Sequence, residues 1–137
     1  MRPYASALDR LRTAGLRPTR QRLALAKLLF DAGHRHVTAE ELHKEAREAD
    51  VGVSLATIYN TLHQFTEAGL LREVVVDSGR CYFDTNISEH HHFFHQDDGH
   101  LVDIPASGIT VENLPKPPQG TEVSRVEVII RVAPARK

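Results

Sequence analysis

The stretch VSLATIYNTLHQFTEAG, residues 53–69, decides the fold of the first half of this chain. Its apolar residues recur every three or four positions and are Leu55, Ile58, Leu62 and Phe65. That period places them on one face of an α-helix. Ser54 is a good N-cap and Gly69 a good stop signal. We therefore predict an amphipathic helix between Ser54 and Gly69 that buries one face.

The sequence after this helix changes to the period of β-strands. Residues 70–76, LLREVVV, and residues 80–84, RCYFD, are short runs rich in β-forming residues. The turn signal DSG separates them. Two such runs around a turn predict a β-hairpin.

Three further helices are predicted upstream. The first ends near Gly15, the second follows an N-cap candidate at Thr19, and the third opens with the capping box Thr38–Glu41. The apolar positions expected in their buried faces are Tyr4, Leu8, Leu11, Leu23, Leu25, Leu28, Leu29, Leu42 and Ala46. Four helices followed by a hairpin predict a winged helix-turn-helix, with the third and fourth helices as the helix-turn-helix and the hairpin as the wing.

Base contacts in such a module come from the N-terminal residues of the recognition helix. Here these residues are Ser54, Ala56, Thr57, Tyr59 and Asn60. The methyl groups of Ala56 and Thr57 suit thymine, and Asn60 suits adenine. Tyr59 is one position away from the apolar stripe, so its hydroxyl is predicted to point outward. The alternative is that Tyr59 covers the core and Thr57 is a solvated surface residue.

Positive charge is concentrated near the N-terminus, although the net charge of the chain is only −1. Residues 1–27 carry one acidic residue, Asp9, against Arg2, Arg10, Arg12, Arg17, Arg20, Arg22 and Lys27. Arg17 precedes a proline, which favours an extended backbone and suits entry into a narrow, A·T-rich minor groove. Arg20 and Arg22 suit phosphate contacts. On charge alone, a solvated arginine-rich helix explains the pattern equally well.

A second, mostly β domain is expected after a hinge at residues 85–89. Its strand candidates are HHHFFH at 90–95, HLVDI at 100–104 and the alternating run EVSRVEVIIRV at 122–132. Residues 114–120, LPKPPQG, leave room for only a short helix. The sequence thus predicts an α+β protein with a winged helix at 1–84 and a small β-rich α/β domain at 90–137.

Five of the nine histidines lie within residues 90–100, next to two phenylalanines. On a strand, His90 and His92 share one face and His91 the other, so the three cannot bind one iron without distortion. Aromatic neighbours disfavour a small hydrated dication and suit a flat macrocycle, and haem iron accepts an axial imidazole. We therefore predict haem or iron as the ligand, with His91 or His92 as axial ligand. The alternatives are a polar strand without a ligand and a pH sensor.

Composition narrows the class of protein. The chain is 41% hydrophobic and 26% charged, which is typical of a globular domain. Its one cysteine, Cys81, permits neither an internal disulfide nor a structural zinc site made of four cysteines, and we expect it to be a packing residue. No apolar run approaches a membrane span, and no signal peptide is apparent. We expect a cytoplasmic protein without a membrane partner.

Several of these stretches together resemble the ferric uptake regulator (Fur) superfamily over nearly the whole chain. They are GLRPTRQR, HVTAEEL, SLATIYNTLHQFTEAGLL, YFDTN and the histidine cluster. Within the superfamily, YFDTNISEHHHFF and LVDIP with LPKPPQG most resemble the iron response regulator (Irr) branch. The resemblance implies a homodimeric or higher-order transcription factor, mainly a repressor, that binds A·T-rich palindromic operators of iron- and haem-related genes. It also implies haem binding at the histidine triplet.

The resemblance further assigns roles to residues. It implies that Arg17 enters the minor groove and that Tyr59 contacts thymine, whereas Asn60 stands where relatives have arginine. Metal-ligand positions of the superfamily correspond here to His36, Asp84 and His92, and the fourth falls on Phe94. A second site would use His91 and a position occupied by Phe93. These losses favour a protein that binds DNA without a permanent metal, and the remaining alternative is a repressor activated by zinc, manganese or iron.

The proposed mechanism is allosteric. A ligand held across residues 85–89 would fix the spacing of the two recognition helices in a dimer, and operator half-sites must match that spacing. Two rival classes are a metalloenzyme using histidines with Asp97 and Asp98, and a metal buffer or haem chaperone. Because no nucleophile or acid–base pair stands out, we do not expect an enzyme.

Overall fold

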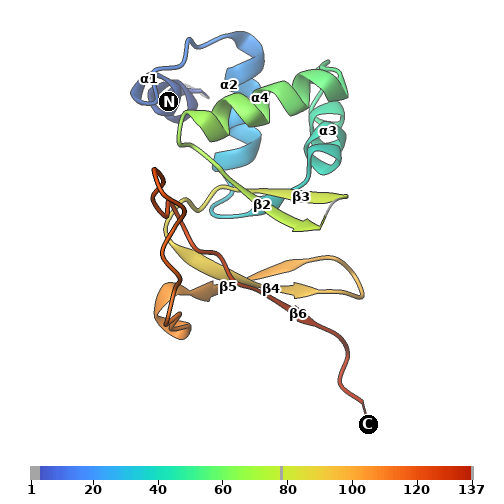
Figure 1. Cartoon of the computed structure of the whole chain (residues 1–137). Helices are drawn as coiled ribbons and strands as arrows, with labels where there is room; N and C mark the ends of the chain where they lie inside the picture. The colour runs from blue at the N-terminus through green and yellow to red at the C-terminus, as the bar shows by residue number, and fades with distance from the viewer. Residues whose placement is uncertain (1–3, 78, 137) are drawn as a thin grey trace. The chain divides into compact units, whose positions relative to one another are not determined.

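The computed structural model of the protein describes residues 4–77 and 79–136 (Figure 1). Arg2, in the basic segment, and Ser78, in the expected hairpin turn, lie outside the described residues. The chain divides into two compact units, Met1–Ile87 and Ser88–Lys137, called here the N-terminal unit and the C-terminal unit. The division falls inside the segment 85–89.

In the described part of the N-terminal unit, four helices precede a hairpin (Figure 1). The helices are α1 (Ala5–Thr13), α2 (Arg20–Phe30), α3 (Ala39–Glu48) and α4 (Leu55–Glu67). The predicted N-caps of the last three are confirmed. Thr19 accepts a hydrogen bond from the Arg22 N–H at 3.2 Å, Thr38 from Glu41 at 3.1 Å, and Ser54 from Thr57 at 3.1 Å. Each cap satisfies an N–H that the first helical turn leaves unpaired.

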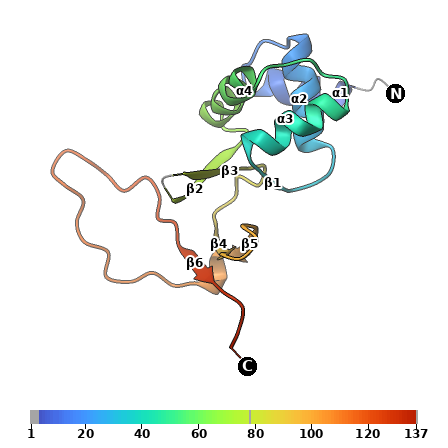
Figure 2. The ribbon, with the colours of Figure 1, turned by 90° about the vertical axis from the view of Figure 1, so that its right-hand side faces the viewer.

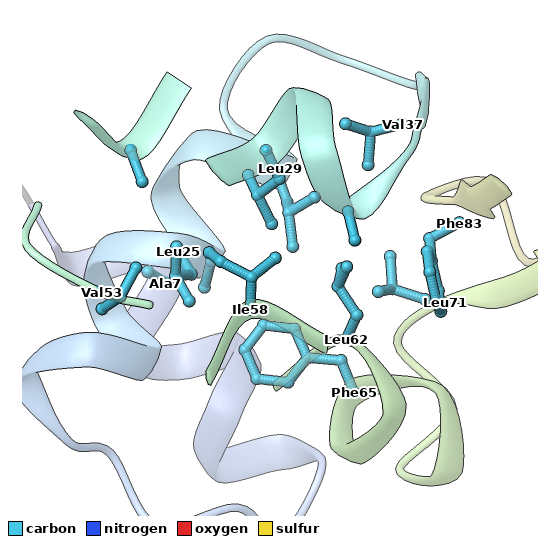
Figure 3. Close-up of a cluster of buried hydrophobic side chains, with 14 of the residues drawn as sticks. Ala7, Leu25, Leu29, Val37, Val53, Ile58, Leu62, Phe65, Leu71 and Phe83 are labelled. Carbon is cyan, nitrogen blue, oxygen red and sulfur yellow. The ribbon is translucent and has the colours of Figure 1, made fainter. Parts of the chain in front are cut away.

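The apolar core of this unit lies between the helices (Figure 3). Ile58, Leu62 and Phe65 of α4 are fully buried, as the helical period predicted. In α1 the prediction is confirmed for Leu11 and wrong for Tyr4, which is exposed, while Ala7 is buried although it was not predicted. Leu8, Leu23, Leu28 and Leu55 are only half-buried. The sequence predicts an apolar face for each helix, but it does not predict which side of that face packs against the neighbouring helices.

The wing is a hairpin of β2 (Arg72–Asp77) and β3 (Arg80–Asp84). The short strand β1 (His36–Val37) pairs with the other side of β3, so the sheet order is β1-β3-β2. The antiparallel register places His36 opposite Asp84. Residues 36 and 84 are far apart in sequence, and the pairing of β1 with β3 brings their backbones together.

The C-terminal unit is a three-stranded sheet with the order β5-β4-β6. Its elements are β4 (His90–His95), β5 (Leu101–Pro105), a 3-10 turn (Ala106–Gly108) and β6 (Ile129–Val132). β5 is antiparallel and β6 parallel to β4. Residues 109–128 form a long open loop between β5 and β6 (Figure 2).

The strand expected at 122–132 is therefore mostly wrong, because only its last four residues pair. The register joins His92 to Ile129, so residues before Glu127 extend beyond the first residue of β4 and have no strand beside them. Among the described residues, no helix has the length and apolar content required to cross a membrane.

Candidate DNA-binding surface and ligand cluster

The N-terminal end of α4 presents the predicted base-reading residues at the surface. Ala56 and Asn60 are exposed, Thr57 is half-buried, and Tyr59 is 37% exposed. The Tyr59 hydroxyl donates a hydrogen bond to Glu40 of α3 at 2.7 Å, so it points away from the core. Glu40 raises the pKa of this hydroxyl because the bond requires its proton. The Ser54 hydroxyl both caps α4 and donates to Thr57 Oγ1 at 3.0 Å.

The arginines before and within α2 differ in their surroundings. Arg17 and Arg20 are exposed, as groove and phosphate contacts require. Arg22 is half-buried, and its guanidinium donates to the Arg17 carbonyl and to Gln64 Oε1, both at 2.9 Å. The guanidinium that the sequence suggested for a phosphate contact thus already has two protein acceptors.

The N-terminal unit also places two predicted ligands next to each other. His36 Nε2 lies 3.2 Å from Asp84 Oδ2, and Asp84 is 1% exposed. The other carboxylate oxygen of Asp84 accepts the Asn86 N–H at 2.9 Å. A buried carboxylate beside an imidazole can orient a metal ligand or serve as one.

The C-terminal unit contains a convergent cluster of donor atoms. The Nε2 atoms of His90 and His92 lie 3.5 Å and 3.4 Å from Asp103 Oδ1. The two imidazole rings are 4.6 Å apart between centroids, and both residues are buried, at 5% and 2% exposure. One ligand atom from each of the three residues lies within 4.8 Å of the other two. Two imidazoles and a carboxylate are donors that first-row divalent metals accept.

A contact with a backbone carbonyl orients the His90 ring for metal binding. His90 Nδ1 lies 2.6 Å from the Ser88 carbonyl oxygen, which can only accept. In the neutral ring the proton is therefore assigned to Nδ1, which leaves a lone pair on Nε2, the nitrogen that lies 3.5 Å from Asp103 Oδ1. This is the arrangement in which a second hydrogen bond orients a metal-binding imidazole.

Asp103 was not singled out from the sequence. It enters the cluster because the β4–β5 register places it opposite His92, and such a register is not readable from local sequence. Phe94, the position that the resemblance gave to a fourth ligand, is fully buried in the sheet. The cluster thus contains two donors, His90 and Asp103, that are not among the ligand positions implied by the resemblance to the superfamily.

His91 lies on the opposite face of β4. Its Nδ1 accepts the Val128 N–H at 3.1 Å, and it is half-buried. Phe93 follows on the same face and is 37% exposed. The predicted alternation is therefore confirmed, since His91 does not join the cluster of His90 and His92.

The remaining candidate ligands occupy less favourable surroundings. The rings of His95 and His100 stack with their centroids 3.9 Å apart, beside the turn between β4 and β5, and His100 also hydrogen-bonds Asp98. Cys81 is half-buried and its thiol donates to Glu73 Oε1 at 3.2 Å. Burial, then the bond to Glu73, raises the pKa of Cys81 to about 12, so the metal-binding thiolate is disfavoured at neutral pH.

A winged helix joined to a small sheet with an imidazole–carboxylate cluster defines a class, the ligand-responsive DNA-binding regulators. The model of the Ferric uptake regulator family matches residues 13–130. The chain therefore belongs to the ferric uptake regulator family, whose members are transcription regulators rather than enzymes. DNA binding, metal binding and self-association are properties of that family.

Individual relatives agree with this assignment. The chain is 38% identical over 95 residues to the ferric uptake regulation protein of Pseudomonas aeruginosa, covering 69% of this chain and 71% of the relative. It is 34% identical over 125 residues to the peroxide operon regulator of Bacillus subtilis, covering 89% and 86%. The Pseudomonas aeruginosa regulator solved with manganese matches with a TM-score of 0.72 at 28% identity, covering 95% and 98%. The predicted superfamily is confirmed, and the closer resemblance to the Irr branch stays a prediction.

Proposed function

We propose that this protein is an iron-responsive transcription regulator, mainly a repressor, whose binding to A·T-rich palindromic operators of iron- and haem-related genes depends on a ligand of the C-terminal unit. The observation that carries the proposal is the convergence of His90, His92 and Asp103. The near-complete burial of the two imidazoles favours a small divalent ion over a macrocycle at their nitrogens. Bound there, an ion would hold β4 and β5 together through charge and coordination.

His36 and Asp84 are a second pair of proposed ligands, within the N-terminal unit. They supply a further imidazole and a buried carboxylate from the N-terminal unit, and both chemistries suit a divalent ion. Five residues, 85–89, separate Asp84 from His90 in the sequence. We propose that ligand binding restricts the conformation of this segment, and that this restriction sets the spacing of the two recognition helices in a dimer.

Haem is the second candidate ligand, and the face of β4 that carries His91 favours it. Ligation through His91 has a cost, because its Nδ1 accepts a backbone N–H and the ring proton is therefore assigned to Nε2; that proton would have to be lost, or the ring would have to rotate. The exposed ring of Phe93 lies on the same face and suits an apolar macrocycle. If haem bound here, His91 would hold it by supplying an imidazole ligand to the iron.

The same face supports a homodimer. Val102, Phe93 and Ile130 are partners in register across β5, β4 and β6, and they are 41%, 37% and 37% exposed. A row of exposed apolar side chains across a whole sheet is typical of an interaction surface. A second copy buries it through a two-fold axis, as closed homodimers do. Arg17, Arg20, Ser54, Thr57, Tyr59 and Asn60 are the proposed DNA contacts of each protomer.

The test begins by selecting operators from random-sequence duplex DNA with metal-stripped, Mn²⁺-loaded and haemin-loaded protein. Gel shifts then compare wild type with the His90→Ala/His92→Ala variant, with His91→Ala, and with His100→Ala as the control outside the cluster. We expect Mn²⁺ to change operator affinity at least tenfold in wild type and the control, and not in the double variant. An effect of haemin that only His91→Ala removes would establish the haem mode.

The direction of the effect separates the two modes. In the Irr-like mode, stripped protein binds the operator and haemin releases it. In the metal-activated mode, stripped protein does not bind and Mn²⁺ or Fe²⁺ restores binding. Failure to select any operator, or equal affinity in all three states, would contradict the proposed function.

A further inference from the structure

The loop that carries Arg17 is fixed in place at several points. Gly15 donates to the Arg12 carbonyl at 3.0 Å and Leu16 to the Leu11 carbonyl at 2.9 Å, which closes the end of α1. Gly15 takes a φ of 76°, a conformation that favours glycine. At the other end of the loop, Thr19 caps α2 through the Arg22 N–H. The backbone around Arg17 is thus held at both ends while its side chain stays exposed.

Arg22 connects this loop to α4, the recognition helix, through two hydrogen bonds. One nitrogen of its guanidinium, Nη1, donates to the Arg17 carbonyl, and Nη2 donates to Gln64 Oε1 on α4, each at 2.9 Å. Gln64 follows Thr57 by seven residues, which is nearly two turns, so both lie on one face of α4 about 10 Å apart. The planar guanidinium has its donors in a fixed fork, so two acceptors in different directions define its position.

We infer that Arg22 is a positioning residue for operator recognition, which holds the Arg17 loop at a fixed distance from the base-reading face of α4. The inference rests on the proposed function, since it assumes that Arg17 and α4 read the same operator. A protein that reads a minor groove with one element and a major groove with another must keep the two elements in register. Arg22 supplies that register without itself contacting DNA.

This role differs measurably from a phosphate contact. A phosphate contact depends on charge, so lysine replaces arginine at little cost, and its loss lowers the slope of log K against log salt by about 1. A bridge depends on two simultaneous hydrogen bonds, which the single ammonium of lysine does not reproduce in the same plane. Its loss lowers the affinity for the operator selectively and leaves the salt slope unchanged.

The experiment measures binding of full-length protein to the selected operator and to a scrambled duplex over a range of salt concentrations. The variants are Arg22→Ala, Arg22→Lys and Gln64→Ala, and Arg20→Ala is the control for a phosphate contact. We expect each of the first three to weaken operator binding roughly tenfold, the cost of losing a charge-assisted hydrogen bond. Their binding to scrambled DNA should stay within about twofold of wild type, with the wild-type salt slope.

The double variant Arg22→Ala/Gln64→Ala should be no weaker than either single variant, because both remove the same bridge. Thermal unfolding checks each fold, and Gln64→Ala carries the test if Arg22→Ala unfolds. The inference is overturned if Arg22→Lys binds like wild type while Arg22→Ala loses about 1 from the slope, if Gln64→Ala has no effect, or if the single effects add. Wild type that fails to prefer the operator would overturn the proposed function as well.

Discussion

The two units of this protein differ in the extent of their apolar cores. The N-terminal unit has a continuous core of aliphatic and aromatic side chains such as Leu25, Ile58 and Phe65, with a few buried polar residues such as Asp84 at its edge, and three of its helices have side-chain N-caps. The C-terminal unit buries Phe94, Leu101 and Ile104 together with the imidazoles of His90 and His92, and leaves an apolar row exposed. Burial of apolar surface drives folding, whereas buried polar groups need partners. The comparison indicates that the first unit is stabilised by its own core and the second by what it binds.

The largest expected effect tests the core of the N-terminal unit. Phe65 is fully buried and stacks at 6.4 Å on Phe30. We expect Phe65→Ala to lower the free energy of unfolding of this unit by about 3–5 kcal/mol, through lost burial and the cavity left behind. Chemical denaturation monitored by circular dichroism measures it. The exposed Val75→Ala is the control, and equal losses for both would contradict a core-stabilised unit.

The next effect tests ligand dependence of the C-terminal unit. Mn²⁺ at 100 times its dissociation constant should stabilise wild type by about 2.7 kcal/mol, because it binds only the folded cluster. Hydrogen exchange of β4 and β5 measures this locally. His92→Ala should remove the stabilisation and His100→Ala should keep it. Stabilisation that survives in His92→Ala would place the ion elsewhere.

The exposed row of the C-terminal unit tests its dependence on a second copy. Phe93→Asp places a charge at the centre of the row and should weaken dimerisation by at least about 2 kcal/mol, or roughly 30-fold. Sedimentation equilibrium measures the change. Val75→Asp places the same charge on an exposed apolar position of the wing. The row is not the dimer surface if both variants dimerise equally.

The last prediction concerns the reactivity of a single thiol of the N-terminal unit, and it involves no change in stability. Because the pKa of Cys81 is raised to about 12, its thiolate should form only far above pH 9 in the folded protein. We expect iodoacetamide at pH 9 to modify native protein at least about 100-fold more slowly than urea-unfolded protein. Glu73→Gln, which removes the acceptor charge, should speed the native reaction. Equal rates in folded and unfolded protein would show that the unit does not protect this thiol.

The sequence alone predicts the features that depend on neighbouring residues, and it does not predict those that depend on contacts between distant segments. Caps at Thr19, Thr38 and Ser54 and the stripe through Ile58 are local signals, so the helices were predictable. The pairing of His92 with Asp103 and of His92 with Ile129 depends on strand register between distant segments. For that reason the sequence did not predict Asp103 as a ligand, and the predicted last strand began too early, at residue 122. The bridge from Arg22 to Gln64 was not predicted because it depends on how α2 packs beside α4, and 42 residues separate the two side chains.

The central claim is that a ligand of the C-terminal unit changes DNA binding by the N-terminal unit, and reciprocity tests it most directly. Coupling between two sites is symmetric, so the operator must change metal affinity by the factor by which metal changes operator affinity. Isothermal titration of Mn²⁺ into the protein, with and without saturating operator, measures that factor. The account predicts two Mn²⁺ dissociation constants that differ at least tenfold, by the same ratio as the operator affinities. Identical constants with and without the operator would contradict it.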